Sequence, residues 1–463
     1  MKKVLSSHFE RLSSPGRIGP VGLRNRMTAA PLSPCLAGMH GWITEDYVAY
    51  IEARARGGAS LIVVEDTLVV DGSKWGRGIV NQPEIWDPNS IPGWKKLTDA
   101  IHYHGAKAGI QINWMSIRAH LKVCPDTEAL GPSAMLLPGF PDFEEPRVPA
   151  TSARHSGGVE VSRAATIDEI MWLEDQYALA ASLARDAGFD VVMIHCTGGH
   201  GIASFNSPYF NQRNDLYGGP LENRMRFGLN IIKKVRPVLK PEMALSVRIP
   251  VDEFLPGGSG KEECIHIAQA YEAAGVDAIH MSCGAFNTHH AMQPIYYPRL
   301  YLEPFLADMR EAVKVPLAVA GSLNDPEDAE RVLRDYRLDF VDLGRALVAD
   351  AEYPKKVVEG RPEDIRRCIR CDKCLHVIVA NHTSIECSVN AEAGRERVLK
   401  IMPAEEAKSV VVVGGGPGGM EAARVAALRG HSVTLVDKGK QLGGNLRRQP
   451  RGAQARGHAA RAA

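Results

Sequence analysis

Short apolar runs alternate with amphipathic stretches from Met27 to about Gly360. Eight runs have the length and composition of buried strands: Met27 to Pro31, Leu61 to Val64, Ala108 to Ile112, Phe189 to Ile194, Ala244 to Arg248, Val276 to Met281, Pro316 to Ala320 and Asp339 to Leu343. Helical patterns lie between them, such as Thr44 to Arg56, Ile167 to Ala187, Leu221 to Val235 and Glu262 to Ala274. Strands that alternate with helices predict a parallel sheet, and eight repeats predict closure into a (β/α)8 TIM barrel. A doubly wound open sheet is the alternative, although it usually needs fewer strands.

The alternation ends after Gly360. A cysteine-rich loop region follows, and the stretch from Lys408 to Val436 then has the pattern strand, glycine turn, helix, strand. Residues 447–463 are mostly Arg, Ala and Gly, which is typical of a disordered tail. We therefore divide the chain into a barrel (1–360), a cysteine segment (361–400), a truncated Rossmann-like βαβ fragment (408–446) and a disordered tail (447–463).

Composition excludes several classes of protein. Of the 463 residues, 45% are hydrophobic and 24% charged, and the formal net charge is +1, so nothing favours binding to nucleic acid. The N-terminus has no apolar core segment, and no run of about 18 apolar residues occurs, so we expect a cytoplasmic protein that does not span a membrane. We expect a small-molecule substrate and leave open a homo-oligomer or an electron-transfer partner.

Four of the nine cysteines lie close together in the sequence. Cys368, Cys371, Cys374 and Cys387 have the spacing C-x2-C-x2-C-x12-C. Three ligands from one tight loop and a fourth from a distance suit a [4Fe-4S] cluster, in which each iron takes one thiolate. Structural zinc is the alternative, but zinc sites more often show two separated C-x2-C pairs. Because this segment is separate from the barrel in the sequence, we expect that replacing Cys371 with Ser removes the iron but leaves a ligand of the barrel bound.

In a barrel of this kind the chemistry takes place at the carboxyl ends of the strands. The residues at these ends are Pro31, Ser33, Glu65, Gln111, His195, Arg248, Gly321, Gly344 and Arg345. The glycines after the seventh and eighth strands, with a nearby cation, match the phosphate-binding corner of such barrels.

The chain also resembles a known family, the flavin oxidoreductases of the old yellow enzyme class. The resemblance is to the long iron-sulfur branch that contains 2,4-dienoyl-CoA reductase, enoate reductase and trimethylamine dehydrogenase. It rests on LRNRM (Leu23 to Met27), SPYFNQRNDLYGGPLENRMRF (Ser207 to Phe227), GRAL (Gly344 to Leu347) and CIRCDKC (Cys368 to Cys374). The resemblance implies FMN with its phosphate at the glycine corner, Gln111 on the pyrimidine edge of the flavin and Arg248 beside N1 and O2.

The sequence departs from the family after the fourth strand. Family members usually carry two polar ligands for the substrate carbonyl there and, two residues later, a Tyr that protonates the α-carbon. Here His195 is kept, Gly198 takes the place of the second ligand and His200 that of the Tyr. We expect His200 and His195 to be the catalytic residues, with an acid step by His200 that fades above roughly pH 7.

A dinucleotide fingerprint lies near the C-terminus. Gly414, Gly416 and Gly419 form G-x-G-x-x-G between a Val-rich strand and a helix, and Asp437 follows as an acid for a ribose hydroxyl. In the family this domain holds FAD or ADP. Since only one βαβ unit is present, we expect FAD to be absent or substoichiometric and NAD(P)H, as an electron donor, to reduce the chain poorly by itself.

Three hypotheses for the function follow. The first is an ene-reductase that transfers hydride from N5 of FMN to an enoyl thioester or another α,β-unsaturated carbonyl. The second is an amine dehydrogenase or N-demethylase of the trimethylamine dehydrogenase type. The third is a non-catalytic electron-transfer or vestigial subunit.

Overall fold

The chain forms two compact units, which divide between Arg397 and Val398. The computed structural model describes residues 9–119, 127, 129–136, 161–285, 293–379 and 381–447.

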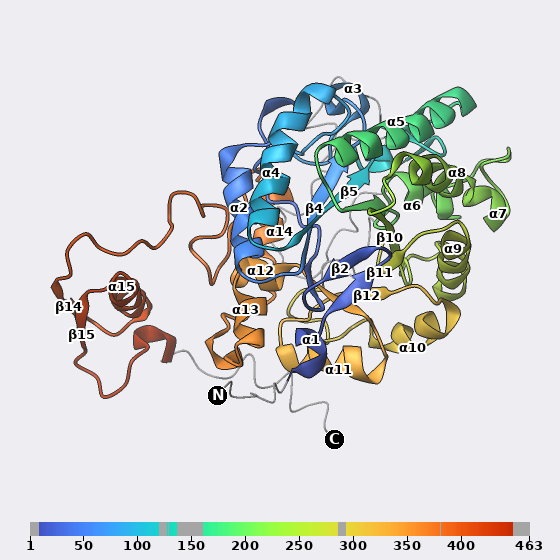
Figure 1. The fold of residues 1–463 in the computed structure, drawn as a ribbon. Coiled ribbons are helices and arrows are strands. Elements are labelled where there is room, and N and C mark those ends of the chain that lie inside the picture. Colours follow the sequence, from blue (N-terminus) through green and yellow to red (C-terminus); the bar gives the residue numbers. More distant parts are fainter. Residues whose placement is uncertain are drawn as a thin grey trace. The chain divides into compact units, whose positions relative to one another are not determined.

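Eight parallel strands of the first unit close into a barrel, in the order β10-β11-β12-β13-β3-β4-β5-β9 (Figure 1). They are β3 (Met27–Ala29), β4 (Leu61–Leu68), β5 (Lys107–Asn113), β9 (Val191–His195), β10 (Ala244–Pro250), β11 (Ala278–Ser282), β12 (Leu317–Ala320) and β13 (Phe340–Leu343). Each overlaps one predicted strand. Because β13 pairs with β3, with Val341 opposite Met27, the sheet has no open edge there. The predicted (β/α)8 barrel is therefore confirmed, and the open sheet was the wrong alternative.

Helices surround the barrel, and the predicted helical stretches lie among them. Their bounds are α1 (Glu10–Ser13), α2 (Glu45–Arg56), α3 (Gly72–Trp75), α4 (Ile91–Tyr103), α5 (Ile167–Asp186), α6 (Gly201–Asn206), α7 (Leu221–Arg224), α8 (Arg226–Val235), α9 (Lys261–Ala273), α10 (Glu303–Ala312), α11 (Pro326–Asp335), α12 (Arg345–Ala349), α13 (Tyr353–Val358) and α14 (Lys373–Val379). Helix α2 begins after Thr44, whose Oγ1 accepts a hydrogen bond from the Tyr47 amide at 3.1 Å. The predicted helix Leu221 to Val235 is divided at Met225 into α7 and α8.

A small hairpin closes the amino-terminal end of the barrel. Strands β1 (Gly16–Ile18) and β2 (Val21–Leu23) pair antiparallel. Their apolar side chains form one buried cluster with residues near the starts of barrel strands, such as Leu61 and Val191. The amino-terminal end is thus filled by packing, which leaves the opposite end for chemistry. A three-stranded sheet of β6 (Leu130–Gly131), β7 (Met135–Leu136) and β8 (Val161–Ala164) lies outside the barrel strands.

The second unit contains β14 (Ser409–Val413), α15 (Pro417–Leu428) and β15 (Ser432–Val436), and its two strands are parallel. Gly415 is the one buried residue within the described residues 398–446. Val411 and Val413 are 65% and 83% exposed, so β14 lacks, within these residues, the cover that parallel strands normally have. The tail predicted for 447–463 lies, apart from Arg447, outside the described residues.

No helix within the described residues is both long enough and apolar enough to cross a bilayer.

Candidate active site

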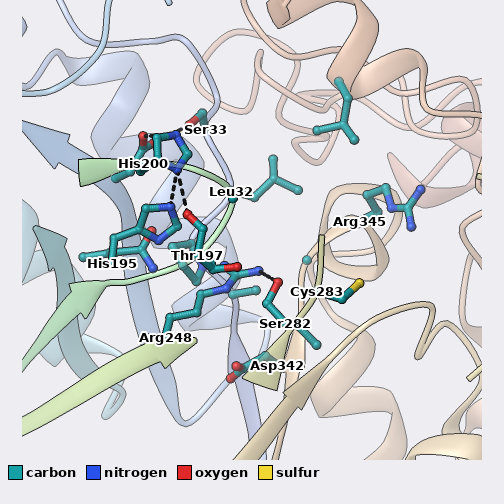
Figure 2. A pocket seen from close by; sticks show the side chains of 18 of the residues that line it. Leu32, Ser33, His195, Thr197, His200, Arg248, Ser282, Cys283, Asp342 and Arg345 are labelled. Carbon is teal, nitrogen blue, oxygen red and sulfur yellow. Dashed lines mark hydrogen bonds and ion pairs between the residues drawn. The ribbon is translucent and has the colours of Figure 1, made fainter. Parts of the chain in front are cut away.

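A cavity of about 390 Å³ lies at the carboxyl ends of the barrel strands (Figure 2). Nine of the residues predicted from the sequence line it: Pro31, Ser33, Gln111, His195, His200, Arg248, Gly321, Gly344 and Arg345. They come from the loop after β3 and from the ends of β5, β9, β10, β12 and β13. The fold therefore brings together residues that are more than 300 positions apart in the sequence.

Glu65 differs from this expectation, because it does not line the cavity. Strand β4 runs on to Leu68, and its register against β5 shifts between Val64 and Asp66, so Glu65 is the extra residue of a β-bulge. Its Oε1 accepts a hydrogen bond from Tyr47 Oη at 2.9 Å, and burial raises the pKa of the Glu65 carboxyl well above its usual range. Glu65 thus packs in the barrel wall.

Asp66 takes the place in the cavity that we had given to Glu65. Its carboxylate accepts hydrogen bonds from Ser33 Oγ at 3.1 Å, Gln82 Nε2 at 3.0 Å and Asn113 Nδ2 at 3.4 Å. Burial raises the pKa of Asp66 to about 6, and the hydrogen bonds from Ser33 and Asn113 and the cation of Arg118 oppose the increase. Asp66 is therefore a carboxyl group that titrates near neutral pH.

The rings of His195 and His200 both line the cavity and contact each other (Figure 2). Nε2 of His195 lies 2.7 Å from Nδ1 of His200, which also lies 3.1 Å from the Thr197 carbonyl oxygen. Because that carbonyl only accepts, we assign a hydrogen to Nδ1 of His200. Nε2 of His195 then accepts, and the neutral ring carries its hydrogen on Nδ1, which is buried without a protein partner within the described residues.

Burial lowers the pKa of both histidines well below 6.5, and nearby positive charge adds to the effect. For His200 the second cause is the cation of Arg118. We had expected His200 to titrate near 6.5. Its pKa lies well below that value because burial disfavours the charged form of the imidazole. Nε2 of His200 lies 4.0 Å from Oδ2 of Asp66, the group that does titrate near that pH.

Arg248 places a cation at the end of β10. Its Nη2 donates to Ser282 Oγ at 3.3 Å, and its Nε is buried without a partner within the described residues (Figure 2). Burial lowers the pKa of the guanidinium, and the carboxylate of Asp342 opposes this. Asp342 itself accepts from Thr28 Oγ1 at 2.5 Å and lies 2.8 Å from His280 Nδ1. A partly buried Arg with one hydroxyl partner has donors left for a ligand.

The glycine corner lies where β12 and β13 end. Gly321 has φ +140°, and a Cβ there would meet Gln293 Oε1 at 2.8 Å, so glycine is required. Arg345 donates to the Gln293 carbonyl at 3.1 Å and forms an ion pair with Asp372 of the cysteine segment.

The four clustered cysteines line a second, small cavity, together with Arg345 and Asp372. No three Cys, His, Asp or Glu side chains in the described part of the chain converge closely enough to hold a single metal ion. Burial raises the pKa of Cys374 to about 12, so its thiol keeps its proton unless a cation compensates the charge. The cysteine segment belongs to the same compact unit as the barrel.

In the second unit Gly414 and Gly416 lie in the turn between β14 and α15, and Gly419 lies in the first turn of α15. Gly414 has φ +104°, which favours glycine, and a Cβ on Gly419 would lie 1.8 Å from the Gly414 carbonyl oxygen. Glycine is therefore required at both positions, and Gly416 lies between them in the sequence. The carboxylate of Asp437 accepts from the amides of Gly415 and Gly439, both at 2.6 Å, and thus lies at the turn.

Sequence reasoning missed Asp66, Arg118, Thr197 and Asp342 as cavity residues. Asp66 directly follows Glu65, but a bulge leaves no pattern in a single sequence that says which of two adjacent acids points inward. Asp342 lies within a predicted strand. Its charge in an otherwise apolar run was the signal that could have identified it as a cavity residue.

Comparisons with known proteins agree with this architecture. The model of the NADH:flavin oxidoreductase / NADH oxidase family matches residues 11–364, and the FAD dependent oxidoreductase model matches residues 409–461. NADH oxidase from Thermoanaerobacter brockii is 36% identical over 443 residues, covering 95% of this chain and 65% of that protein.

Two solved structures are similar. A complex of 2-naphthoyl-CoA reductase with 2-naphthoyl-CoA has 31% identity and a TM-score of 0.86, covering 95% of this chain and 66% of that one. Histamine dehydrogenase from Rhizobium sp. 4-9 has 27% identity and a TM-score of 0.82, covering 95% and 61%. The chain therefore spans 61% to 66% of the length of these three proteins. With a match over most of its length, the chain belongs to the NADH:flavin oxidoreductase / NADH oxidase family, which confirms the resemblance drawn from its motifs.

Proposed function

We propose that this chain is an FMN- and [4Fe-4S]-dependent oxidoreductase that reduces the C=C bond of an enoyl thioester or another α,β-unsaturated carbonyl. The observation that carries the proposal is the convergence of Gln111, Arg248 and the His195–His200 pair on one cavity at the carboxyl ends of the strands. The similarity to 2-naphthoyl-CoA reductase, whose complex holds a CoA thioester, supports this substrate class.

The residues present fit FMN. Gly321, Gly344 and Arg345 would hold its phosphate, and Gln111 would bind the pyrimidine edge. Arg248, with its buried Nε lacking a partner within the described residues, would lie beside N1 and O2. When bound, FMN supplies hydride from its N5 atom.

The two histidines bind and orient the substrate. In the tautomer assigned above, Nδ1–H of His195 is a buried donor without a partner within the described residues. Such a donor could bind the carbonyl oxygen of the substrate. Donation to that oxygen withdraws electron density from the alkene and makes its β-carbon more electrophilic. A neutral imidazole can do this across the physiological pH range because burial keeps the pKa of both rings low.

Asp66 and His200 would supply the proton that balances the addition of hydride to the substrate. Asp66 titrates near pH 6, and its Oδ2 lies 4.0 Å from Nε2 of His200. A carboxylic acid with a pKa close to the working pH is an efficient proton source. His200 lies between Asp66 and His195, so a proton from Asp66 would pass through His200 and His195 to the carbonyl oxygen. The enol formed in this way gives the saturated product by tautomerisation.

The cysteine site fits a [4Fe-4S] cluster better than zinc. Four thiolates around one zinc ion at 2.3 Å would stand only about 3.8 Å apart, whereas a cubane spreads them over four irons. All four cysteines line one cavity, and their spacing of three close ligands and one distant ligand differs from the two separated C-x2-C pairs that are more common in zinc sites.

An amine dehydrogenase or N-demethylase is the second candidate, favoured by the similarity to histamine dehydrogenase and by the carboxylate of Asp66, which could bind an ammonium group. Against it, Arg118 and Arg248 also line the cavity and would repel a protonated amine. We therefore rank the carbonyl substrate first.

One experiment separates the candidates. The purified protein is loaded with FMN anaerobically and, in separate samples, the reduced flavin is mixed with α,β-unsaturated thioesters and ketones and the oxidised flavin with methylated amines. Reoxidation by the alkenes supports the proposal. Bleaching by an amine, without reoxidation by any alkene, would replace it with the second candidate. Failure of both reactions would favour a non-catalytic subunit.

A further inference from the structure

The cysteine segment contacts the walls of the barrel cavity at several points. Helix α14, which contains Cys374, directs Leu375, Ile378 and Val379 to the cavity lining. These three apolar residues lie one, four and five positions after Cys374. The wall of the larger cavity is therefore built partly from the segment that carries the cysteines.

The polar residues between the cysteines also bind cavity residues. Arg370, between Cys368 and Cys371, donates from Nη1 to the Tyr297 carbonyl at 2.9 Å and to Ser322 Oγ at 3.4 Å. Ser322 lines the cavity directly after Gly321. The first turn of the cysteine loop is thus attached to the glycine corner.

Asp372, between Cys371 and Cys374, forms an ion pair with Arg345. Their side chains are 18% and 11% exposed, so the pair is largely shielded from solvent. Arg345 lines both the large cavity and the small cavity of the cysteines. One guanidinium therefore belongs to both sites.

A fourth contact is made by Ile385, which lies two residues before Cys387. The amide of Ile385 donates to the Pro34 carbonyl at 2.9 Å, and Pro34 directly follows Pro31 to Ser33 in the cavity wall. Three different strand-end loops are thus held by the cysteine segment. Our expectation that loss of the cysteine site leaves the barrel site unaffected assumed that the two segments are separate, and these contacts argue against that assumption.

We propose that the cysteine site and the flavin site bind their groups cooperatively, with the Asp372–Arg345 pair as the main link. The inference rests on the proposed binding of FMN and a cluster. Four bound thiolates fix the loop and with it Arg345 and α14, so an iron-free chain must order these elements when FMN binds. Linkage requires the reverse as well: bound FMN must make the iron harder to remove, by the same factor.

The test measures both directions on the full-length chain. FMN affinity is determined by flavin fluorescence for iron-loaded protein and for protein depleted with a chelator. Separately, the chelator concentration that removes half of the iron is measured with and without FMN. We expect a coupling factor of roughly 10 in each direction, within the usual range for linked sites. A factor of one in both directions would overturn the inference.

Two variants locate the link. Asp372→Asn keeps all four cysteines but removes the charge that holds Arg345, so the coupling factor should fall towards one. Glu386→Gln is the matched control, because Glu386 forms an exposed ion pair with Lys373 on the same loop and lines neither cavity. It should keep the full factor. Equal coupling in both variants would contradict the role of Asp372, even if iron depletion unfolds the wild-type loop.

Failure of the proposed function gives a different result. If the iron-loaded wild-type chain binds no FMN, the proposed flavin site is wrong. If it binds FMN with the same affinity with or without iron, the flavin site stands and the cooperativity is wrong.

Discussion

Nε2 of His195 lies 2.7 Å from Nδ1 of His200, and Nε2 of His200 lies 4.0 Å from Oδ2 of Asp66. Two imidazoles, whose pKa values are lowered by burial, thus connect a carboxyl group with a pKa of about 6 to Nδ1 of His195, where we propose that the carbonyl binds. In this arrangement Asp66, and not His200, sets the pH dependence.

The first prediction concerns that pH dependence. The pKa of Asp66 is raised to about 6, so the proton is present below that pH and is lost above it. The rate of reoxidation of the reduced flavin by an alkene should therefore be highest below about pH 6 and fall as the pH rises. Asp66→Asn should be slower and lack this transition. A profile of the variant that keeps the wild-type break near pH 6 would assign the transition to another group.

The second prediction concerns His200. Replacing it with Phe removes the imidazole that joins Asp66 to His195, so the alkene half-reaction should slow by roughly 100-fold or more. Flavin binding should change little, since the flavin contacts are proposed for other residues. His40→Phe, at an exposed loop position, is the control. A His200→Phe variant with the wild-type rate and pH profile would remove His200 from the mechanism and leave His195 alone.

Arg248 carries the third prediction. In the proposed site the guanidinium would face charge that develops only on reduction of the flavin, so Arg248→Ala should weaken the binding of reduced FMN more than that of oxidised FMN. A tenfold difference corresponds to about 59 mV for a one-electron couple, and the potential should fall by at least roughly that amount. Arg248→Lys, which keeps the charge, should lie closer to wild type. An unchanged potential in Arg248→Ala would place the guanidinium away from the flavin.

The fourth prediction concerns metal content. Anaerobically purified protein should contain about four iron atoms and one FMN per chain, because the chain offers four thiolates and one barrel phosphate site. Cys371→Ser should lower the iron content and, through the cooperativity proposed above, also the affinity for FMN. Stoichiometric zinc with little iron would show that the cysteine site is not a cluster site.

The barrel could be predicted in detail because its strands follow a simple pattern of apolar runs between helices. Contacts that depend on a bulge or on packing between distant segments could not. The sequence placed Glu65 in the cavity, but one extra residue in β4 turns Asp66 inward instead. It also separated the cysteine segment from the barrel, since nothing in the local pattern shows that Asp372 meets Arg345. The lowered pKa of His200 depends on burial and on Arg118, which is 82 positions away in the sequence.

The most direct test of the central claim is a single-turnover experiment. FMN-loaded protein is photoreduced under anaerobic conditions and mixed with increasing amounts of an enoyl thioester, while the flavin absorbance is recorded and the product is identified by mass spectrometry. An ene-reductase should regain its full oxidised flavin absorbance and yield the saturated thioester in proportion. Flavin that stays reduced in the presence of excess thioester, and of a panel of other α,β-unsaturated carbonyls, would contradict the account.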